Sequence, residues 1–139
     1  MELSTGAGDP DLDQRLSDEL DAFNASATGD LDVAPQQELT VRADDADGLA
    51  GGVSGWTWGT AAGIAMTWVR ADHRGTGLGA RLMTQFEEEA RRRGCTHAFV
   101  TSFTFQAPAF YERLGYREIL RWDAVPDVGH DDVHLRKDL

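Results

Sequence analysis

Alternating glycines flanked by arginines give residues 74–81 the clearest potential for chemistry in the chain; this segment reads RGTGLGAR. It follows a strand-like run that ends near Val69 and precedes an amphipathic helical pattern. Glycine lets backbone N–H groups come close to a ligand, and a helix N-terminus adds unpaired donors and a partial positive charge. The pattern therefore predicts a cradle for a phosphate or pyrophosphate group.

Other phosphate-binding loops, and a turn without any ligand, are the alternatives for this segment. Residues 75–80 match the dinucleotide fingerprint G-x-G-x-x-A, which also needs an acidic residue at the end of the next strand to hold the ribose. That strand-like run ends at residues 101–104, which read TSFT, so a dinucleotide oxidoreductase is the weaker interpretation. No Gly-Lys-Ser/Thr follows the glycines, which excludes a nucleotide-triphosphate loop. A plain helix-entry turn is disfavoured because arginines flank it in an acidic chain.

The composition indicates one acidic domain. The chain has 139 residues, of which 41% are hydrophobic, and a formal net charge of -11. We expect a single domain over residues 1–139, with residues 1–10 frayed or forming a short edge strand at residues 2–5. The negative charge argues against nucleic acid as a partner, because phosphate backbones are bound by clustered Lys and Arg.

The sequence predicts no membrane segment, no disulfide and no metal site. No run is long and apolar enough for a bilayer, and the acidic N-terminus is unlike a secretory signal, so we expect a cytoplasmic protein with no membrane partner. The single Cys95 lacks an internal disulfide partner and fits a small core residue. Residues 130–134 contain two histidines and two aspartates, and they fit a solvated turn better than a metal site.

The first half of the chain predicts one helix and three antiparallel strands. Apolar side chains share one helical face from Asp11 onward, at Leu12, Leu16, Leu20 and Phe23. Residues 24–35 are rich in turn formers and predict a loop. Strands are expected at residues 37–42, 49–58 and 62–70, and their short polar turns are typical of a meander.

The second half predicts a crossover helix, a buried strand, a short helix and two final strands. The crossover helix ends at Gly94, and Glu87, Glu88 and Glu89 each precede an arginine by four residues. Residues 96–103 are apolar enough to predict a strand buried on both faces. A helix at residues 107–114 and strands at residues 116–125 and 133–137 complete the pattern.

The second half also resembles a known family. Arg74-x-x-Gly77-x-Gly79 follows a strand that ends in Trp68-Val69, and residues 110–116 read FYERLGY. This combination resembles the GCN5-related N-acetyltransferase (GNAT) family, whose signature loop binds the pyrophosphate of acetyl-CoA. Residues 101–111, TSFTFQAPAFY, are similar to a branch of small bacterial and archaeal members. The resemblance spans roughly residues 37–139.

The resemblance implies a fold and a cofactor site. The implied GNAT fold is α/β (α+β), with a mixed, mostly antiparallel sheet of about six or seven strands, splayed between strands four and five and flanked by about three or four helices. Acetyl-CoA, the cosubstrate, would lie in the splay, with Tyr111 beside its sulfur as the catalytic residue. The residues carried over as cofactor-binding are Trp68, Val69, Arg70, Arg74, Gly75, Thr76, Gly77, Leu78, Gly79, Ala80, Gln106 and Phe110. Gln106 departs from the family, because many members have an Asn there that contacts the cofactor.

Direct acetyl transfer to an amine suits these residues. The reaction needs a neutral amine, donors for the oxyanion and help for the departing thiolate, and it needs no protein nucleophile. A phenol near pKa 10 is a weak acid toward a thiol near pKa 8.5, so we expect Tyr111 to act mainly as a hydrogen-bond donor. The general base is left open. Asp72 and His73 lie close to the site in the sequence, and an acceptor amine of low pKa, or bulk water, would make a protein base unnecessary.

The predicted function is an N-acetyltransferase that moves the acetyl group of acetyl-CoA to a small-molecule or peptide amine. A non-catalytic acyl-CoA-binding module on the same scaffold is the alternative. Trp56, Trp58 and Trp68 would lie near the acceptor cleft or pack on the sheet. A homodimer is compatible with the family.

The acidic surface predicts that stability depends on salt. Lys137 is the only lysine among 13 basic residues, a composition that resembles proteins of salt-loving organisms, and 1 M salt shortens the Debye length to about 3 Å. We expect the temperature of unfolding to rise as NaCl is raised to molar concentrations. Full stability in dilute buffer would count against this hypothesis.

Overall fold

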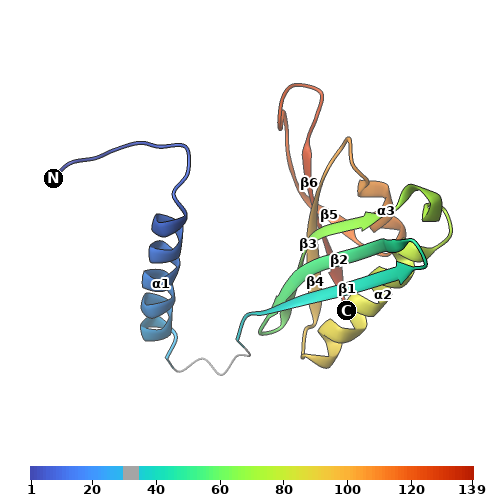
Figure 1. Cartoon of the computed structure of the whole chain (residues 1–139), viewed down its shortest axis with the longest axis horizontal. Helices are drawn as coiled ribbons and strands as arrows, with labels where there is room; N and C mark the ends of the chain where they lie inside the picture. Colours follow the sequence, from blue (N-terminus) through green and yellow to red (C-terminus); the bar gives the residue numbers. More distant parts are fainter. Residues whose placement is uncertain (30–34) are drawn as a thin grey trace. The chain divides into compact units, whose positions relative to one another are not determined.

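The computed structural model describes residues 1–29 and 35–139, and it divides into two compact units, Met1–Asp32 and Val33–Leu139 (Figure 1). One functional domain over residues 1–139 stays a prediction. Among the described helices, none combines the length with the hydropathy that a membrane span requires.

The N-terminal unit contains the helix predicted from Asp11, here α1 (Pro10–Ala27). The carboxylate of Asp9 caps it by accepting a hydrogen bond from the Leu12 N–H at 3.0 Å. Residues 2–5 form no strand. The loop predicted over residues 24–35 is wrong at residues 24–27, which belong to α1. Alanine favours the helix there, and the Thr28 hydroxyl caps its end by donating to the Asn24 carbonyl at 2.6 Å. Residues 30–34 of the predicted loop lie outside the described residues.

The C-terminal unit is built on one six-stranded sheet in the order β1-β2-β3-β4-β6-β5. Its first three strands form the predicted antiparallel meander: β1 (Gln37–Asp45), β2 (Gly48–Trp58) and β3 (Ala61–Val69).

The remaining strands follow a crossover. β4 (His97–Phe103) pairs with β3 in parallel and with β6 (Asp132–Asp138) in an antiparallel direction, and β5 (Arg117–Trp122) pairs with β6. The sheet is therefore mixed and mostly antiparallel, as the resemblance implied.

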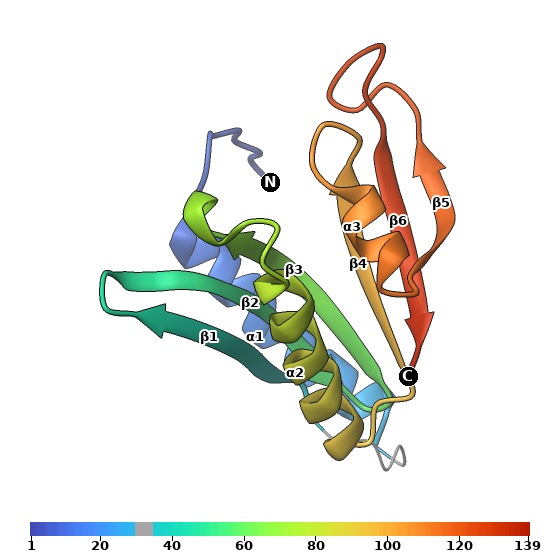
Figure 2. The same cartoon turned by 90° about the vertical axis from the view of Figure 1, so that its right-hand side faces the viewer.

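The helices of this unit cover one face of the sheet (Figure 2). α2 (Leu78–Arg92) contacts β1, β2 and β3, and α3 (Pro108–Arg113) contacts β5 and β6. The apolar stripe of α2 is buried, with Phe86 and Ala90 fully enclosed. Gly94 ends α2 at φ +94°, the left-handed conformation that glycine adopts without strain.

β4 is buried on one face only, which corrects the prediction of two buried faces. Ala98, Val100 and Ser102 are buried, whereas Phe99 and Thr101 between them are exposed. The apolar sequence of β4 was compatible with a second covering layer, but both helices of residues 35–139 lie on the same side.

The splay expected between strands four and five lies between β3 and β4. These two would be the fourth and fifth strands only if residues 2–5 formed the first, and residues 2–5 form no strand. These strands pair only from Ala61↔His97 to Ile64↔Val100 and then part (Figure 2). A bulge accompanies the separation, because Gly55 pairs with Ile64 but Ser54 pairs with Met66, which leaves Ala65 as an extra residue. The sheet thus opens just beyond the bulge.

An ion pair between a buried glutamate and a partly exposed lysine connects α2 to the other half of the sheet. Glu87 pairs with Arg91 as expected, at 3.7 Å, but it is buried, and its Oε2 lies closer to Lys137 Nζ on β6, at 2.7 Å. The Tyr116 hydroxyl donates to Glu87 Oε1 at 3.1 Å. Burial, followed by the Glu87 carboxylate, raises the pKa of Tyr116 far above its usual value.

Two surface pairs of α2 were also predicted. Arg93 binds Glu89 as expected, at 2.9 Å, but Arg92 binds Glu89 instead of Glu88. The alternative is available because residues three and four apart are both neighbours on a helix.

Replacement of Lys137 by Met is expected to lower the free energy of unfolding by about 3 kcal/mol, because the buried Glu87 carboxylate loses its nearest cation. The double variant Lys137→Met/Glu87→Gln should recover part of that loss, since its buried group is neutral. Urea unfolding of both variants measures the difference. A Lys137→Met variant as stable as the wild type would refute the role of the pair.

Candidate cofactor site

A cavity of about 650 Å³ lies where β3 parts from β4. Its walls come from the end of β3, the glycine turn, the first turn of α2, and α3. The volume falls within the range of sites for small molecules.

Most of the predicted site residues line this one cavity. They are Trp68, Val69, Arg74, Gly75, Gly77, Leu78, Gly79, Ala80, Phe110 and Tyr111. The tertiary fold thus joins the glycine turn to a helix that follows it by about thirty positions in the sequence.

Three predicted residues are not part of the lining. The Thr76 hydroxyl donates to the His73 carbonyl at 2.5 Å, and Gln106 Oε1 accepts from the Phe103 N–H at 2.9 Å. Arg70 points to carboxylates outside the cavity.

The backbone of the turn is arranged as an anion cradle. Gly75 and Gly77 have φ values of +75° and +86°, a conformation that side chains disfavour. Gly77 is the N-cap of α2, and the first amide of the helix with a backbone acceptor is that of Arg81, which donates to Gly77 O at 3.1 Å. Among the described residues, none accepts from the amides of residues 78–80. These amides are available to an anionic ligand.

Gly79 allows the closest approach between the walls of the cavity. A Cβ atom at this position would lie 3.0 Å from the Phe110 ring of α3. The missing side chain therefore lets the first turn of α2 lie against α3, which brings Tyr111 near the cradle.

Two arginines supply positive charge to the cavity. Arg74 Nε donates to the Val69 carbonyl at 3.1 Å, and Arg113 lines the wall from α3. Across residues 1–29 and 35–139, no carboxylate forms an ion pair with either guanidinium. Sequence reasoning missed Arg113, although its position one turn after Phe110 on a short helix was a usable signal.

Tyr111 offers a hydroxyl to the same cavity. Its side chain is 8% exposed, and its ring packs edge to face on Phe110 at 5.1 Å and on Tyr116 at 6.0 Å. Among the described residues, none forms a hydrogen bond with the Tyr111 hydroxyl. The rigidly packed ring thus presents a donor to a ligand.

The tryptophans have different surroundings. Trp68 lines the cavity and is 47% exposed, whereas Trp56 packs edge to face on Phe99 at 5.4 Å. Trp58 is exposed and lies outside the lining.

Cys95 is buried, as predicted, and burial raises the pKa of its thiol. In the segment 130–134, Asp131 binds Arg121 at 2.8 Å and His134 lies 3.1 Å from Asp132. A different set, Asp45, Asp72 and His73, has ligand atoms within 4.8 Å of one another.

The cavity suits a ligand with an anionic diphosphate at one end and a reactive group near Tyr111. The first part would meet the helix amides of residues 78–80 and two arginines, Arg74 and Arg113, which form no ion pair within the described part of the chain. The second part would be bounded by aromatic rings. These features fit the pyrophosphate and thioester of acetyl-CoA.

Comparisons with known proteins agree with this geometry. Residues 7–116 match the model of the acetyltransferase (GNAT) family. The chain is 32% identical over 111 residues to acetyltransferase Atu2258 of Agrobacterium fabrum, a match that covers 80% of each chain. A solved acetyltransferase structure from Bacillus cereus has a TM-score of 0.85 at 28% identity and covers 99% of this chain and 98% of that one.

A further relative matches over a shorter segment. The chain is 45% identical over 73 residues to blasticidin-S acetyltransferase of Streptomyces morookaense. This match covers 50% of the present chain and 52% of the relative, so it spans only about half of that protein.

Gly77→Ala is expected to weaken CoA binding by about tenfold or more, because a left-handed alanine costs about 1–2 kcal/mol and the turn would relax away from the cradle. Gly94→Ala is the matched control, since Gly94 has φ +94° at the other end of α2 and lies outside the cavity. Calorimetric titration with CoA compares the two variants. Equal CoA affinities would contradict the proposed cradle.

Proposed function

Because the chain belongs to the GNAT family of acetyltransferases, we propose that it transfers the acetyl group of acetyl-CoA directly to an amine of a small molecule. The family assignment makes acetyl-CoA the cosubstrate. The observation that carries the proposal is the cavity of the β3–β4 splay, which joins the glycine cradle to Tyr111.

The anionic end of the cosubstrate is assigned to the glycine turn. The amides of residues 78–80 and the guanidinium of Arg74 would bind the pyrophosphate, and Arg113 adds a second cation from α3. Charge-assisted hydrogen bonds of this kind are stronger than neutral ones. The two arginines would supply local positive charge on a chain whose net charge is -11.

The reactive end is assigned to Tyr111. Bound acetyl-CoA supplies a thioester, whose carbon forms a bond with the acceptor nitrogen while the carbon–sulfur bond breaks. The Tyr111 hydroxyl donates a hydrogen bond at the sulfur and stabilises its developing negative charge. The thiolate takes up one proton and the acceptor nitrogen loses one.

The proton of the acceptor is assigned to water. Asp72 accepts two hydrogen bonds from Arg70, and His73 Nε2 lies 2.7 Å from Asp45 Oδ2. His73 also lines the cavity, whereas Asp72 does not. Because Arg70 and Asp45 already engage these two side chains, the proposal gives neither the role of general base.

A small-molecule amine is the favoured acceptor. The relative that is 45% identical over 73 residues is named for acetylation of blasticidin S, a small molecule. A peptide amine is the alternative to be tested beside it. A cytoplasmic location, a homodimer and the absence of a nucleic-acid partner stay predictions from the sequence.

The direct test measures release of the CoA thiol from acetyl-CoA with a panel of amines. The panel contains blasticidin S, polyamines, amino sugars and short peptides, and each reaction is run in dilute buffer and in molar NaCl. Amine-dependent release, with an acetylated product seen by mass spectrometry, supports the proposal. Tight CoA binding without release under any condition supports the non-catalytic module, and failure to bind CoA overturns both.

Tyr111→Phe is expected to lower kcat by roughly 10- to 100-fold, because the charge on the departing sulfur loses a hydrogen bond. The dissociation constant of CoA should change less than twofold, since the ring remains in place. Tyr116→Phe removes a hydroxyl from the same aromatic cluster outside the cavity and should leave kcat unchanged. Steady-state kinetics and calorimetry give both quantities; an unchanged kcat in Tyr111→Phe removes Tyr111 from the mechanism.

A further inference from the structure

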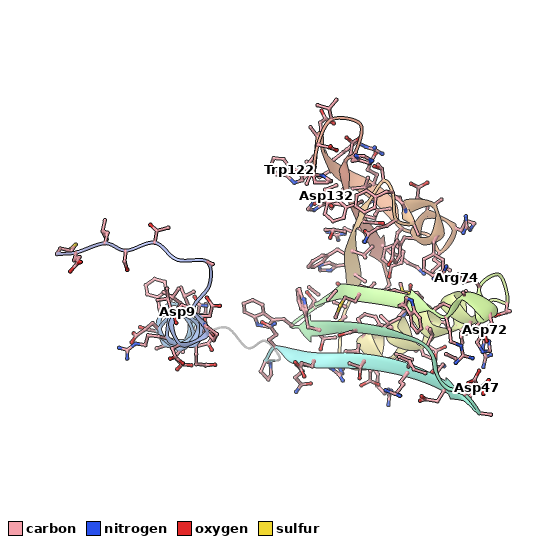
Figure 3. All side chains as sticks on the ribbon, turned by 45° about the horizontal axis from the view of Figure 1, so that its top comes forward. Asp9, Asp47, Asp72, Arg74, Trp122 and Asp132 are labelled. Carbon is pink, nitrogen blue, oxygen red and sulfur yellow. The ribbon has the colours of Figure 1, made fainter. Side chains whose placement is uncertain are left out.

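We propose that Arg70 and Asp45 are positioning residues, which hold residues 71–77 in the conformation that binds the pyrophosphate. This inference rests on the proposed function, and it gives Arg70 a different role from the direct cofactor contact that the sequence predicts. The three residues labelled Asp47, Asp72 and Arg74 in Figure 3 lie at the same end of the three-stranded half of the sheet, where this network forms.

Every donor of the Arg70 side chain is already used. Nε and Nη2 donate to the two carboxylate oxygens of Asp72 at 2.7 and 2.9 Å. Nη2 and Nη1 donate to the two oxygens of Asp45 at 2.5 and 3.3 Å, and Nη1 also donates to the Leu49 carbonyl at 3.2 Å. A guanidinium has five N–H donors, so none is left for a phosphate oxygen.

The Asp45 carboxylate binds Arg70, His73 and the Asp47 N–H. Asp45 lies at the end of β1, and its carboxylate accepts from the Asp47 N–H at 2.9 Å and lies 2.7 Å from His73 Nε2. The hydrogen bonds from Arg70 and then from His73 hold the pKa of Asp45 well below its usual range. Asp45 is therefore ionised at neutral pH and connects two segments distant in the sequence.

The network fixes the residues just before the cradle. The short 3₁₀ helix η1 (Ala71–His73) is attached to the β1–β2 hairpin through both Asp72 and His73. The His73 carbonyl then accepts from the Thr76 hydroxyl. Hydrogen bonds therefore hold Asp72, His73 and Thr76, the last residue before Gly77.

Such attachment lowers the cost of binding. A loop that is ordered before the ligand arrives loses less conformational freedom on association. The same guanidinium occupies the space between the carboxylates of Asp45 and Asp72, so their clustering with His73 is explained by an internal cation.

The hairpin offers a matched control for the charge change. Arg42 Nε and Nη2 bind the carboxylate of Asp44 at 2.7 and 2.8 Å, a two-bond pair of the same kind. Asp44 precedes Asp45 directly, and among the described residues no hydrogen bond or ion pair joins Arg42 or Asp44 to residues 70–77.

The experiment compares Asp45→Asn, Arg70→Lys and Asp44→Asn in the full chain. Calorimetry gives the dissociation constant of CoA, kinetics give the KM for acetyl-CoA and kcat, and hydrogen exchange of the ligand-free protein reports on residues 71–77. Asp45→Asn and Arg70→Lys should weaken CoA binding and raise KM by about tenfold, with kcat at saturation within twofold of the wild type. Both should exchange faster at residues 71–77, and Asp44→Asn should match the wild type throughout.

Three results would overturn the inference. One is unchanged exchange at residues 71–77 in Asp45→Asn. Another is an equal effect of Asp44→Asn on CoA binding. The third is a loss of CoA affinity in Arg70→Lys with wild-type affinity in Asp45→Asn, which is the pattern of a direct Arg70 contact. A wild type that binds no CoA would overturn the proposed function instead, while exchange would still test whether Asp45 holds the turn.

Discussion

The short parallel pairing of β3 and β4 is the constraint on which the rest of the structure depends. The two strands stay together only up to Ile64 and Val100, and the Ala65 bulge follows at once. Their separation creates the cavity, and it also removes backbone hydrogen bonds that would join the two halves of the sheet. The pair of the buried Glu87 with Lys137 connects α2 to β6 across those halves. The helices packed on one face of the sheet therefore hold its two halves together, while the parted strands leave a cavity.

Arginine has two roles at this site, and its hydrogen-bond partners distinguish them. Arg70 has all of its donors occupied by Asp45, Asp72 and a carbonyl, so it belongs to the scaffold. Arg74 and Arg113 line the cavity and, within the described residues, lack a carboxylate partner. A protein with net charge -11 thus concentrates available cations where an anionic cosubstrate would enter.

Sequence patterns predicted the elements well and their surroundings less well. The meander, the glycine turn and α2 were expected within a few residues of their observed bounds, because glycine conformation and apolar spacing act over one or two turns. β4 was expected to be buried on both faces, but an apolar strand does not reveal how many layers cover it. The burial of Glu87 was not predicted, since nothing near it in sequence indicates that Lys137 and Tyr116 lie opposite.

By itself, the sequence determined the fold family, the glycine turn that begins α2 and the aromatic helix that bears Tyr111. These depend on local φ preferences and on motifs whose residues are close in the chain. Only the tertiary structure decided that Arg113 lines the cavity and that Arg70 is withdrawn from it. Arg70 is separated from Asp45 by 25 positions, and Glu87 from Lys137 by 50. The role of a charged side chain depends on which opposite charge packing brings within hydrogen-bond distance, and that distance exists only in the folded chain.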